Sequence, residues 1–493
     1  MAVIPRSPVA VRPGGSVLPQ YLAAAAANLA YLCCGTSLGW SSPALPQLLE
    51  AGWLSLEAAS WVASLLPLLA ALGPVIGGAL CATLGARRAL LVAGLPFLPA
   101  WLATAWAAQH ASVAGLCAGR AIAGAAMGAV FTALPVYVTE IAQDEVRGTL
   151  GSLMQGFITG GLLVEYCVGP FTTAAQLSMV SAATPVLFLL AMLAAAPESP
   201  LFLLSRGRRD LAEEALMRLR GRPAAGVKAE LQKMEACLSP PQSDAGAGAG
   251  AGSGGGTWAR RWCSRAAVRA ILLSLAMVTL QQLTGINAVL FFGTHLLNMA
   301  ASDSPISSAQ GNAIMGFVML LASFATPALA DRVGRKVLLA VSAFGMAFSE
   351  ALLGLYCYNK EDPTWQQYSW LPVFCLILYI IVFTIGFGPL PWTVMAEMLP
   401  PGVKSGASAL TVSLCWVLGF LVTRFLTDML DALGVEGTFW LFAACSLIAG
   451  FFIVFLLPET KGKSLQEIQQ LLEGKNTCKE DPGGSHEMTT VKV

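Results

Sequence analysis

The segment Gly437–Thr460 reads GTFWLFAACSLIAGFFIVFLLPET. Its first part, residues 437–457, carries no charged side chain and is 21 residues long, which is enough to cross a hydrocarbon layer of about 30 Å as a helix. Pro458-Glu459-Thr460 then ends the apolar stretch. The same pattern occurs earlier, where residues 177–196 are followed by Pro197-Glu198-Ser199. The sequence therefore predicts membrane helices and an internal repeat.

Apolar segments of this kind recur along the whole chain. Hydrophobic residues make up 56% of the 493 residues and charged residues only 12%, about half the charged content of a soluble protein. The expected fold class is all-α: a polytopic membrane protein with twelve transmembrane helices in two six-helix bundles. The first six spans lie near 18–40, 58–80, 88–108, 112–138, 150–170 and 177–196, and the second six near 267–297, 308–330, 336–357, 370–396, 404–427 and 437–457.

These spans divide the chain into five parts. Between the two bundles, charged and apolar residues alternate at helical spacing from Arg209 to Met234, which predicts amphipathic helices beneath the membrane. The stretch Ala245–Gly256 is nearly all Gly and Ala and is expected to be a flexible link. The expected parts are the cytoplasmic N-terminus 1–17, the first bundle 18–196, the cytoplasmic linker 197–266, the second bundle 267–457 and the cytoplasmic tail 458–493.

Charged residues sort by side of the membrane. Clusters of Arg and Lys fall in alternate connections, the largest between Arg206 and Arg222. By the positive-inside rule these connections and both termini are cytoplasmic. The formal net charge of +1 excludes a polybasic nucleic-acid-binding protein. The expected location is the plasma membrane, and an endosomal or lysosomal membrane is the alternative.

A series of motifs, in order along nearly the whole chain, resembles the sugar porters of the major facilitator superfamily, the glucose-transporter family. Within that family, Trp40-Ser41-Ser42-Pro43 and short external loops are most similar to insect facilitated trehalose transporter-like members. The matching motifs are Gly119-Arg120, Pro135-x-Tyr137-x-x-Glu140 with Arg147-Gly148, Pro197-Glu198-Ser199-Pro200, Gln281-Gln282-Leu283-Thr284-Gly285-Ile286-Asn287, Asp331-Arg332-x-Gly334-Arg335-Lys336, Gly388-Pro389-x-Pro391-Trp392 with Glu397, and Pro458-Glu459-Thr460-Lys461-Gly462.

The resemblance implies a site for a neutral sugar. Such a site needs groups that both donate and accept hydrogen bonds without a fixed buried charge, which describes amides. The residues expected to bind substrate are Gln155, Gln281, Gln282, Asn287, Trp392, Phe383 and Trp416. Trp392 is expected to stack on the sugar ring. The alternatives are interhelical hydrogen bonds for the amides and ordinary packing for Phe383 and Trp416.

The resemblance also implies a cytoplasmic gate of salt bridges that closes the inner side while the carrier faces outward. The residues expected to form it are Arg87, Arg120, Glu140, Arg147, Glu198, Arg332, Arg335, Glu397, Lys404 and Glu459. Small or apolar residues stand at Ala82, Thr83 and Leu201, where the family usually has polar or charged ones, so the clamp of the first half is expected to be weaker. The alternative is that these charges only set the topology.

Two departures bear on mechanism and substrate. No acid lies between Gln20 and Glu50, and Ser37 stands about where proton-coupled sugar porters carry an Asp, which favours facilitated diffusion. Glu165 lies inside the span 150–170 and is a candidate for proton coupling; the alternative is that it reaches water at the outer end of its helix. Phe291, Phe292 and Cys415 replace polar residues of glucose transporters, which puts glucose in doubt as the substrate.

The short motif Glu467-x-x-x-Leu471-Leu472 has two interpretations, an acidic dileucine sorting signal or the apolar face of a C-terminal amphipathic helix. No nucleophile with a neighbouring base, phosphate loop or metal-ligand cluster occurs, so the sequence predicts neither an enzyme nor a cofactor or metal. The expected partners are a small neutral sugar and the lipid bilayer, with no nucleic acid and a monomer as the functional unit. A proton-coupled symporter and a non-transporting sugar sensor are the alternative functions.

Overall fold

The computed structural model describes residues 16–143, 145–238, 262–300, 306–400, 402–463 and 465–473. The Gly/Ala-rich stretch Ala245–Gly256 and most of both predicted terminal segments lie outside them. In the first half of the chain the helices are α1 (Leu18–Gly39), α2 (Ser41–Glu50), α3 (Leu56–Ala70), α4 (Gly73–Leu84), α5 (Ala86–Gly94), α6 (Phe97–Gln109), α7 (Val113–Ile141), α8 (Arg147–Val168), the short η1 (Gly169–Phe171), α9 (Ala174–Ser181) and α10 (Ala183–Ala195).

The linker and the second half are helical as well. The linker contains α11 (Pro200–Ser205), α12 (Arg209–Arg220) and α13 (Ala224–Leu238). The second half contains α15 (Arg265–Leu283), α16 (Ile286–Ala300), α17 (Ser308–Val333), α18 (Arg335–Asn359), α19 (Pro363–Gln366), α20 (Leu371–Ile385), α21 (Leu390–Met398), α22 (Lys404–Leu456) and α23 (Leu465–Glu473).

Many of these helices follow one another directly and together form stretches long enough to cross a membrane. Among the described residues, ten stretches satisfy both length and hydropathy. Helix α8 corresponds to the expected span 150–170. Helix α22 is 53 residues long and covers the expected spans 404–427 and 437–457, which meet at Gly434, where φ is 74°. Dividing α22 into two spans adds one span to the ten stretches, and α8 adds another. The total then equals the twelve spans expected from the sequence.

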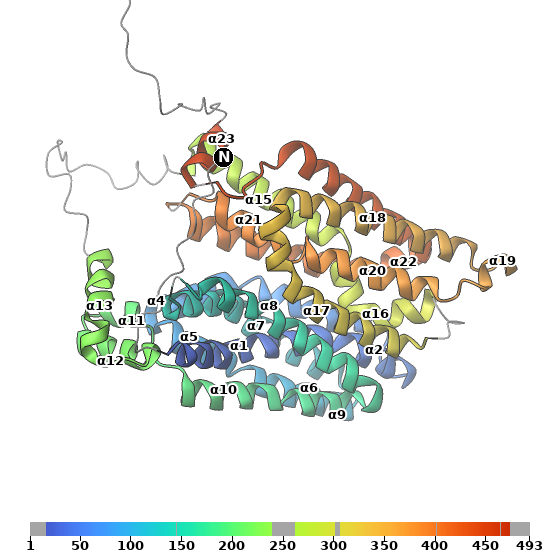
Figure 1. The fold of residues 1–493 in the computed structure, drawn as a ribbon. Coiled ribbons are helices and arrows are strands. Elements are labelled where there is room, and N and C mark those ends of the chain that lie inside the picture. The colour runs from blue at the N-terminus through green and yellow to red at the C-terminus, as the bar shows by residue number, and fades with distance from the viewer. Residues whose placement is uncertain are drawn as a thin grey trace, which may run out of the picture.

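The two halves lie side by side, and α11, α12 and α13 project from one end of the molecule (Figure 1). We call this end the linker end and the opposite one the far end. Contacts of α3 with α22, α8 with α17, and α2 with α16 join the halves.

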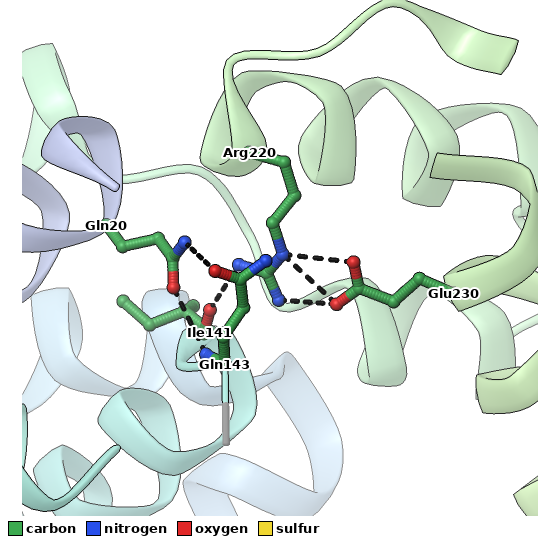
Figure 2. Close-up of polar contacts among 5 residues, drawn as sticks. All are labelled: Gln20, Ile141, Gln143, Arg220 and Glu230. Carbon is green, nitrogen blue, oxygen red and sulfur yellow. Dashed lines mark hydrogen bonds and ion pairs between the residues drawn. The ribbon is translucent and has the colours of Figure 1, made fainter. Parts of the chain in front are cut away.

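A buried arginine, Arg220, joins the linker helices to the first half (Figure 2). Arg220, at the end of α12, is only 2% exposed. Its Nη1 donates to the carbonyl of Ile141 at the end of α7 (2.9 Å), and its Nε and Nη2 donate to the carboxylate of Glu230 on α13 (3.0 and 2.7 Å). Beside it, Gln143 exchanges hydrogen bonds with Gln20 of α1. The linker helices are therefore anchored through a charge-assisted contact whose arginine is buried and whose glutamate is partly exposed.

The C-terminal helix α23 packs against the second half. Ile468 and Leu472 are 2% and 4% exposed, and Arg269 of α15 donates to the carbonyl of Leu472 (2.8 Å). The Leu472 side chain is therefore part of a packed amphipathic helix, which supports the second interpretation of the dileucine-like motif.

Small residues allow helices of the first half to approach closely. A Cβ at Gly128 of α7 would lie 2.2 Å from the carbonyl oxygen of Ala70, and one at Gly73 of α4 would lie 2.1 Å from the backbone of Gly128. Membrane helices associate through such close contacts because lipid supplies no hydrophobic driving force between them.

We predict that Gly128→Ala lowers the stability of the purified protein by about 1–3 kcal/mol, because the added methyl group overpacks this contact. The matched control is Gly78→Ala on α4, where a Cβ meets no atom within 4 Å. Thermal unfolding in detergent compares the two. Equal melting temperatures would contradict the close approach of α7 to α3 and α4.

Candidate functional site

A broken helix lies at the centre of the candidate site. Helix α15 ends at Leu283 and α16 begins at Ile286. Between them Gly285 has φ +79°, a conformation that side chains disfavour, and a Cβ there would lie 2.6 Å from the ring of Phe442. The break brings residues on either side of it toward one point, as in the discontinuous helices of transporters.

Two of the predicted amides meet at this break. Asn287 Nδ2 donates to Gln282 Oε1 at 2.5 Å, and Gln282 Nε2 contacts the Sγ of Cys415 on α22 at 2.9 Å. Gly419 makes room for them, because a Cβ there would lie 2.7 Å from Asn287 Nδ2. Gln282 and Asn287 are each 6% exposed. Side chains from α15, α16 and α22 thus form one polar cluster.

The third amide of the segment supports a second break. Gln281 Nε2 donates to the carbonyls of Phe387 (2.5 Å) and Gly388 (3.1 Å), in the irregular segment between α20 and α21. Its Oε1 is buried and has no hydrogen-bond partner among the described residues. Gln281 therefore satisfies backbone groups that the break frees and retains an acceptor for a ligand.

The predicted aromatic residues lie on the helices around these breaks. Trp392 is partly buried on the first turn of α21. Phe383 stacks on Tyr379 within α20, with ring centroids 6.2 Å apart. The ring centroids of Trp416 on α22 and Phe131 on α7 are 5.4 Å apart, across the boundary between the halves.

Gln155 comes from the other half of the molecule. It is partly buried on α8, which packs against α17 at the boundary between the halves. A Cβ on the adjacent Gly156 would lie 3.1 Å from the ring of Phe324 on α17. The structure thus brings Gln282 and Asn287 together, directs Gln281 to the second break, and leaves Gln155 on a separate helix at the boundary.

Glu165 is enclosed by protein. Its side chain is fully buried, which does not agree with the alternative that it reaches water at its helix end. Oε1 accepts a hydrogen bond from the Ser181 hydroxyl at 2.5 Å, whereas Oε2 has no partner among the described residues. A buried carboxyl with a free oxygen is an unusual group for a membrane helix.

Arg120 does not lie with the other charges of the expected gate. It lies two turns into α7 and therefore about 30 Å along the helix axis from Glu140. Its guanidinium donates to the carbonyl of Ser37 (2.6 Å) and the hydroxyl of Ser41 (2.9 Å) and lies over the ring of Trp40. This position corrects the expectation that Arg120 belongs to the gate: the charge joins α7 to α1 and α2 toward the far end.

At the linker end, the two halves repeat one arrangement. Glu198 Oε1 accepts the backbone N–H of Arg87 (3.0 Å) at the start of α5. Glu459 accepts the backbone N–H groups of Arg335 (3.2 Å) and Lys336 (3.1 Å) at the start of α18. Each carboxylate thereby satisfies free N–H groups at a helix N-terminus and compensates its dipole.

The other predicted gate residues lie near these two carboxylates or on helix ends of the same face. Arg335 pairs with Glu397 (3.3 Å), and Arg88 lies 4.0 Å from Glu198. Lys404 Nζ donates to the Ala396 carbonyl, and Lys461 Nζ donates to the Arg332 carbonyl. Glu140 is partly buried near the end of α7, and the side chain of Arg147 lies outside the described part of the chain. Each of these contacts stays within one half of the protein.

Polar contacts join the halves at more than one level: Ser413, nearer the start of α22, donates to the carbonyl of Ala71 (2.9 Å), and the others lie toward the far end. Ser42 Oγ of α2 accepts from Asn312 Nδ2 (2.6 Å) and from the backbone N–H of Thr294 (3.0 Å). Nearby, the hydroxyl of Tyr166 donates to the carbonyl of Leu290. These bonds tie the first half to α16 and α17.

An ionic contact adds to this closure. Arg424 of α22 lies 3.8 Å from Glu57 of α3 and sits over the ring of Trp61 at 4.8 Å. The Ser60 hydroxyl donates to the Arg424 carbonyl at 2.6 Å. The far end is therefore bridged by both polar and cation–π contacts.

Sequence reasoning missed Glu350. It is 3% exposed on α18 and accepts a hydrogen bond from Ser446 of α22 at 2.8 Å. The sequence offered a signal for a functional residue here, because Glu350 is an acid inside the expected span 336–357. No comparable signal marks Ser42 or Asn312, because their partners lie on the other half of the chain.

The broken helices, the buried amides and the paired halves define a polytopic membrane carrier, and comparison with solved structures confirms the all-α major facilitator fold. The inward-open conformation of the xylose transporter XylE from E. coli is similar with a TM-score of 0.74 at 22% identity, covering 92% of this chain and 99% of the other. A proton:xylose symporter XylE structure bound to 6-bromo-6-deoxy-D-glucose gives a TM-score of 0.70 at 21% identity, over 92% and 99%.

The chain belongs to the sugar (and other) transporter family, which residues 41–472 match. It is 36% identical to the facilitated trehalose transporter Tret1 of Bombyx mori over 92% of this chain and 86% of that one. It is also 36% identical to the Tret1 of Drosophila virilis, of which it spans about half the length (49%). The expected family is confirmed, and the protein is a transporter and not an enzyme.

We predict that Glu459→Gln destabilises the protein by about 1–3 kcal/mol, because one amide oxygen cannot replace both carboxylate oxygens at the start of α18. The control is Glu50→Gln, an exposed acid at the far end. Thermal unfolding measures both variants. A Glu459→Gln protein as stable as the control would show that the carboxylate does not cap this helix.

Proposed function

We propose that the protein carries a neutral sugar, a hexose or trehalose, down its gradient by alternating access. The observation that carries the proposal is the amide cluster at the α15–α16 break. Gln282 and Asn287 are buried, uncharged and able to donate and accept, and Gln281 retains a free acceptor. Sugar hydroxyls need this combination, and a fixed charge there would cost more to bury.

Trp392 supplies the apolar surface that the proposal requires. It follows the irregular segment that Gln281 supports, so the ring and the amides lie on elements that the same hydrogen bonds connect. An aromatic ring stacks on the C–H face of a pyranose. We assign Gln155 to the opposite wall of the site, together with Phe383 and Trp416 near its edges.

The contacts between halves support a carrier closed at the far end. Ser42 and Arg424 bridge the halves there, whereas the carboxylates Glu198 and Glu459 contact helix starts of their own half. In the proposed cycle the far-end contacts break when the carrier faces outward, and charges at the linker end then meet across the halves. Each such contact is worth only about 1 kcal/mol, which suits two states of similar energy.

Trehalose is the favoured substrate within this class. The chain resembles proteins named facilitated trehalose transporters at 36% identity. Phe291, Phe292 and Cys415 are buried near the cluster and reduce its capacity for the hydroxyls of glucose.

We also propose that the linker end is cytoplasmic, that the protein works as a monomer and that it resides in the plasma membrane. The arginines of α12 and the charges at the starts of α5 and α18 lie at this end, as the positive-inside rule expects.

Proton-coupled symport is the second candidate, because Glu165 offers one specific observation in its favour. Its carboxyl is buried with one oxygen unpartnered, in the same half as the buried Arg120. Facilitated diffusion is preferred because Arg120 is already satisfied by Ser37 and Ser41.

We predict that Gln282→Ala and Trp392→Ala each raise the KM for sugar counterflow in proteoliposomes about tenfold, the effect of one lost hydrogen bond or stacking contact. Gln367→Ala and Trp370→Ala, at the far-end connection before α20, are matched controls and keep the wild-type KM. Unchanged kinetics in both site variants would refute the assigned site.

We predict that trehalose or hexose counterflow is the same at two internal pH values and persists in Glu165→Gln, which keeps a partner for Ser181. A uniporter needs no proton. If an inward proton gradient instead drives sugar above its equilibrium level, and Glu165→Gln abolishes this accumulation, the protein is a symporter.

A further inference from the structure

A basic cavity of about 450 Å³ lies at the linker end, where the α4–α5 connection faces the linker helices. Side chains of both signs line it, with positive charge in excess. The charged residues are Arg87, Arg88, Arg206, Arg208 and Arg218, with Glu198 and Glu214. Five guanidinium groups thus face two carboxylates, and the sugar site uses none of this space.

Two of the arginines are held by backbone oxygens. Arg206 Nη2 donates to the carbonyls of Ala82 (3.0 Å) and Thr83 (3.2 Å), and its guanidinium sits over the ring of Phe202. Arg218 Nη2 donates to the carbonyl of Ala194 (2.8 Å). These contacts position the guanidinium groups without neutralising their charge, so the cavity keeps its positive field.

The acids do not balance this charge. Glu198 directs Oε1 to the backbone N–H groups of Arg87 and Ser199, and its Oε2 is 4.0 Å from Arg88, whose side chain is 63% exposed. The Nε of Arg87 is buried and has no hydrogen-bond partner within the described residues. Arg208 is exposed and forms no ion pair with another described residue. The cavity therefore contains guanidinium donors that a ligand can use.

We propose that this cavity binds a phosphate group, carried either by an anionic lipid headgroup or by a soluble phosphate ester. Arginine forks match phosphate oxygens in geometry and charge. The cavity lies where the membrane helices α4 and α5 meet, the level at which basic pockets contact headgroups. A bound phosphate joins the α4–α5 connection to α12 and adds to the anchorage that Arg220 provides between α12 and α7.

The test measures binding to the purified full-length protein in neutral detergent. The probes are a short-chain phosphatidylinositol phosphate, ATP and, as the uncharged comparison, a short-chain phosphatidylcholine. The variant Arg208→Gln removes one exposed charge from the cavity, and Arg88→Gln with Arg208→Gln removes two. The control, Lys228→Gln with Lys233→Gln, removes two exposed charges from α13 outside the cavity.

We expect the affinity for the phosphate-bearing probe to fall about fivefold for each arginine removed, and to stay at the wild-type value in the control. If only the phosphatidylinositol phosphate shows this loss of affinity, the ligand is a lipid headgroup. If ATP shows it, the ligand is a soluble phosphate ester. Equal binding by all variants, equal loss in the lysine control, or no binding of either probe would overturn the proposal. Because the readout is binding, failure here leaves the sugar-transport proposal standing.

Discussion

The hydrocarbon core supplies no water, so every polar group exposed by a broken helix must find its partner within the protein. Two breaks in the second half create this demand, one at Gly285 and the other between α20 and α21. Gln281 links the two breaks, because it lies just before the first one and its side chain donates to the carbonyls of Phe387 and Gly388 at the second.

The internal repeat explains how such a site becomes a carrier. Each half ends its last membrane helix with a carboxylate, Glu198 or Glu459, that caps an earlier helix of the same half. Each half is thereby held as a unit, and its relation to the other half depends on a few replaceable contacts. Ser42 and Arg424 form such contacts at the far end. Rocking about the proposed central site requires rigid halves with a weak boundary.

Much of the fold could be predicted from the sequence, because the hydropathy that marks membrane helices is a local property of the chain. The membrane spans agree with the helices to within several residues at most ends. The position of Arg120 was predicted wrongly, although the N-cap at Ser112 places it only two turns into α7. Grouping it with the other charges followed the motifs and ignored its distance along the helix.

The partners of buried polar groups could not be predicted. Ser42 and Asn312 are 270 residues apart, and Glu350 meets Ser446 across 96 residues. Such pairings depend on the rotation of each helix about its axis relative to its neighbours. The hydrophobic periodicity of one helix does not determine which residues of another helix it meets.

In the proposed transport cycle, the two halves move about a sugar site and separate at the far end. The most direct measurement is the distance between spectroscopic labels, introduced as unnatural amino acids at Glu50 of the first half and Asp362 of the second, in protein reconstituted with and without trehalose or hexose. Alternating access predicts two populations of molecules. In one the labels are close together and the far end is closed, and in the other the labels are farther apart. Adding a transported sugar changes the proportion of the two populations. A single distance that no transported sugar alters would contradict alternating access.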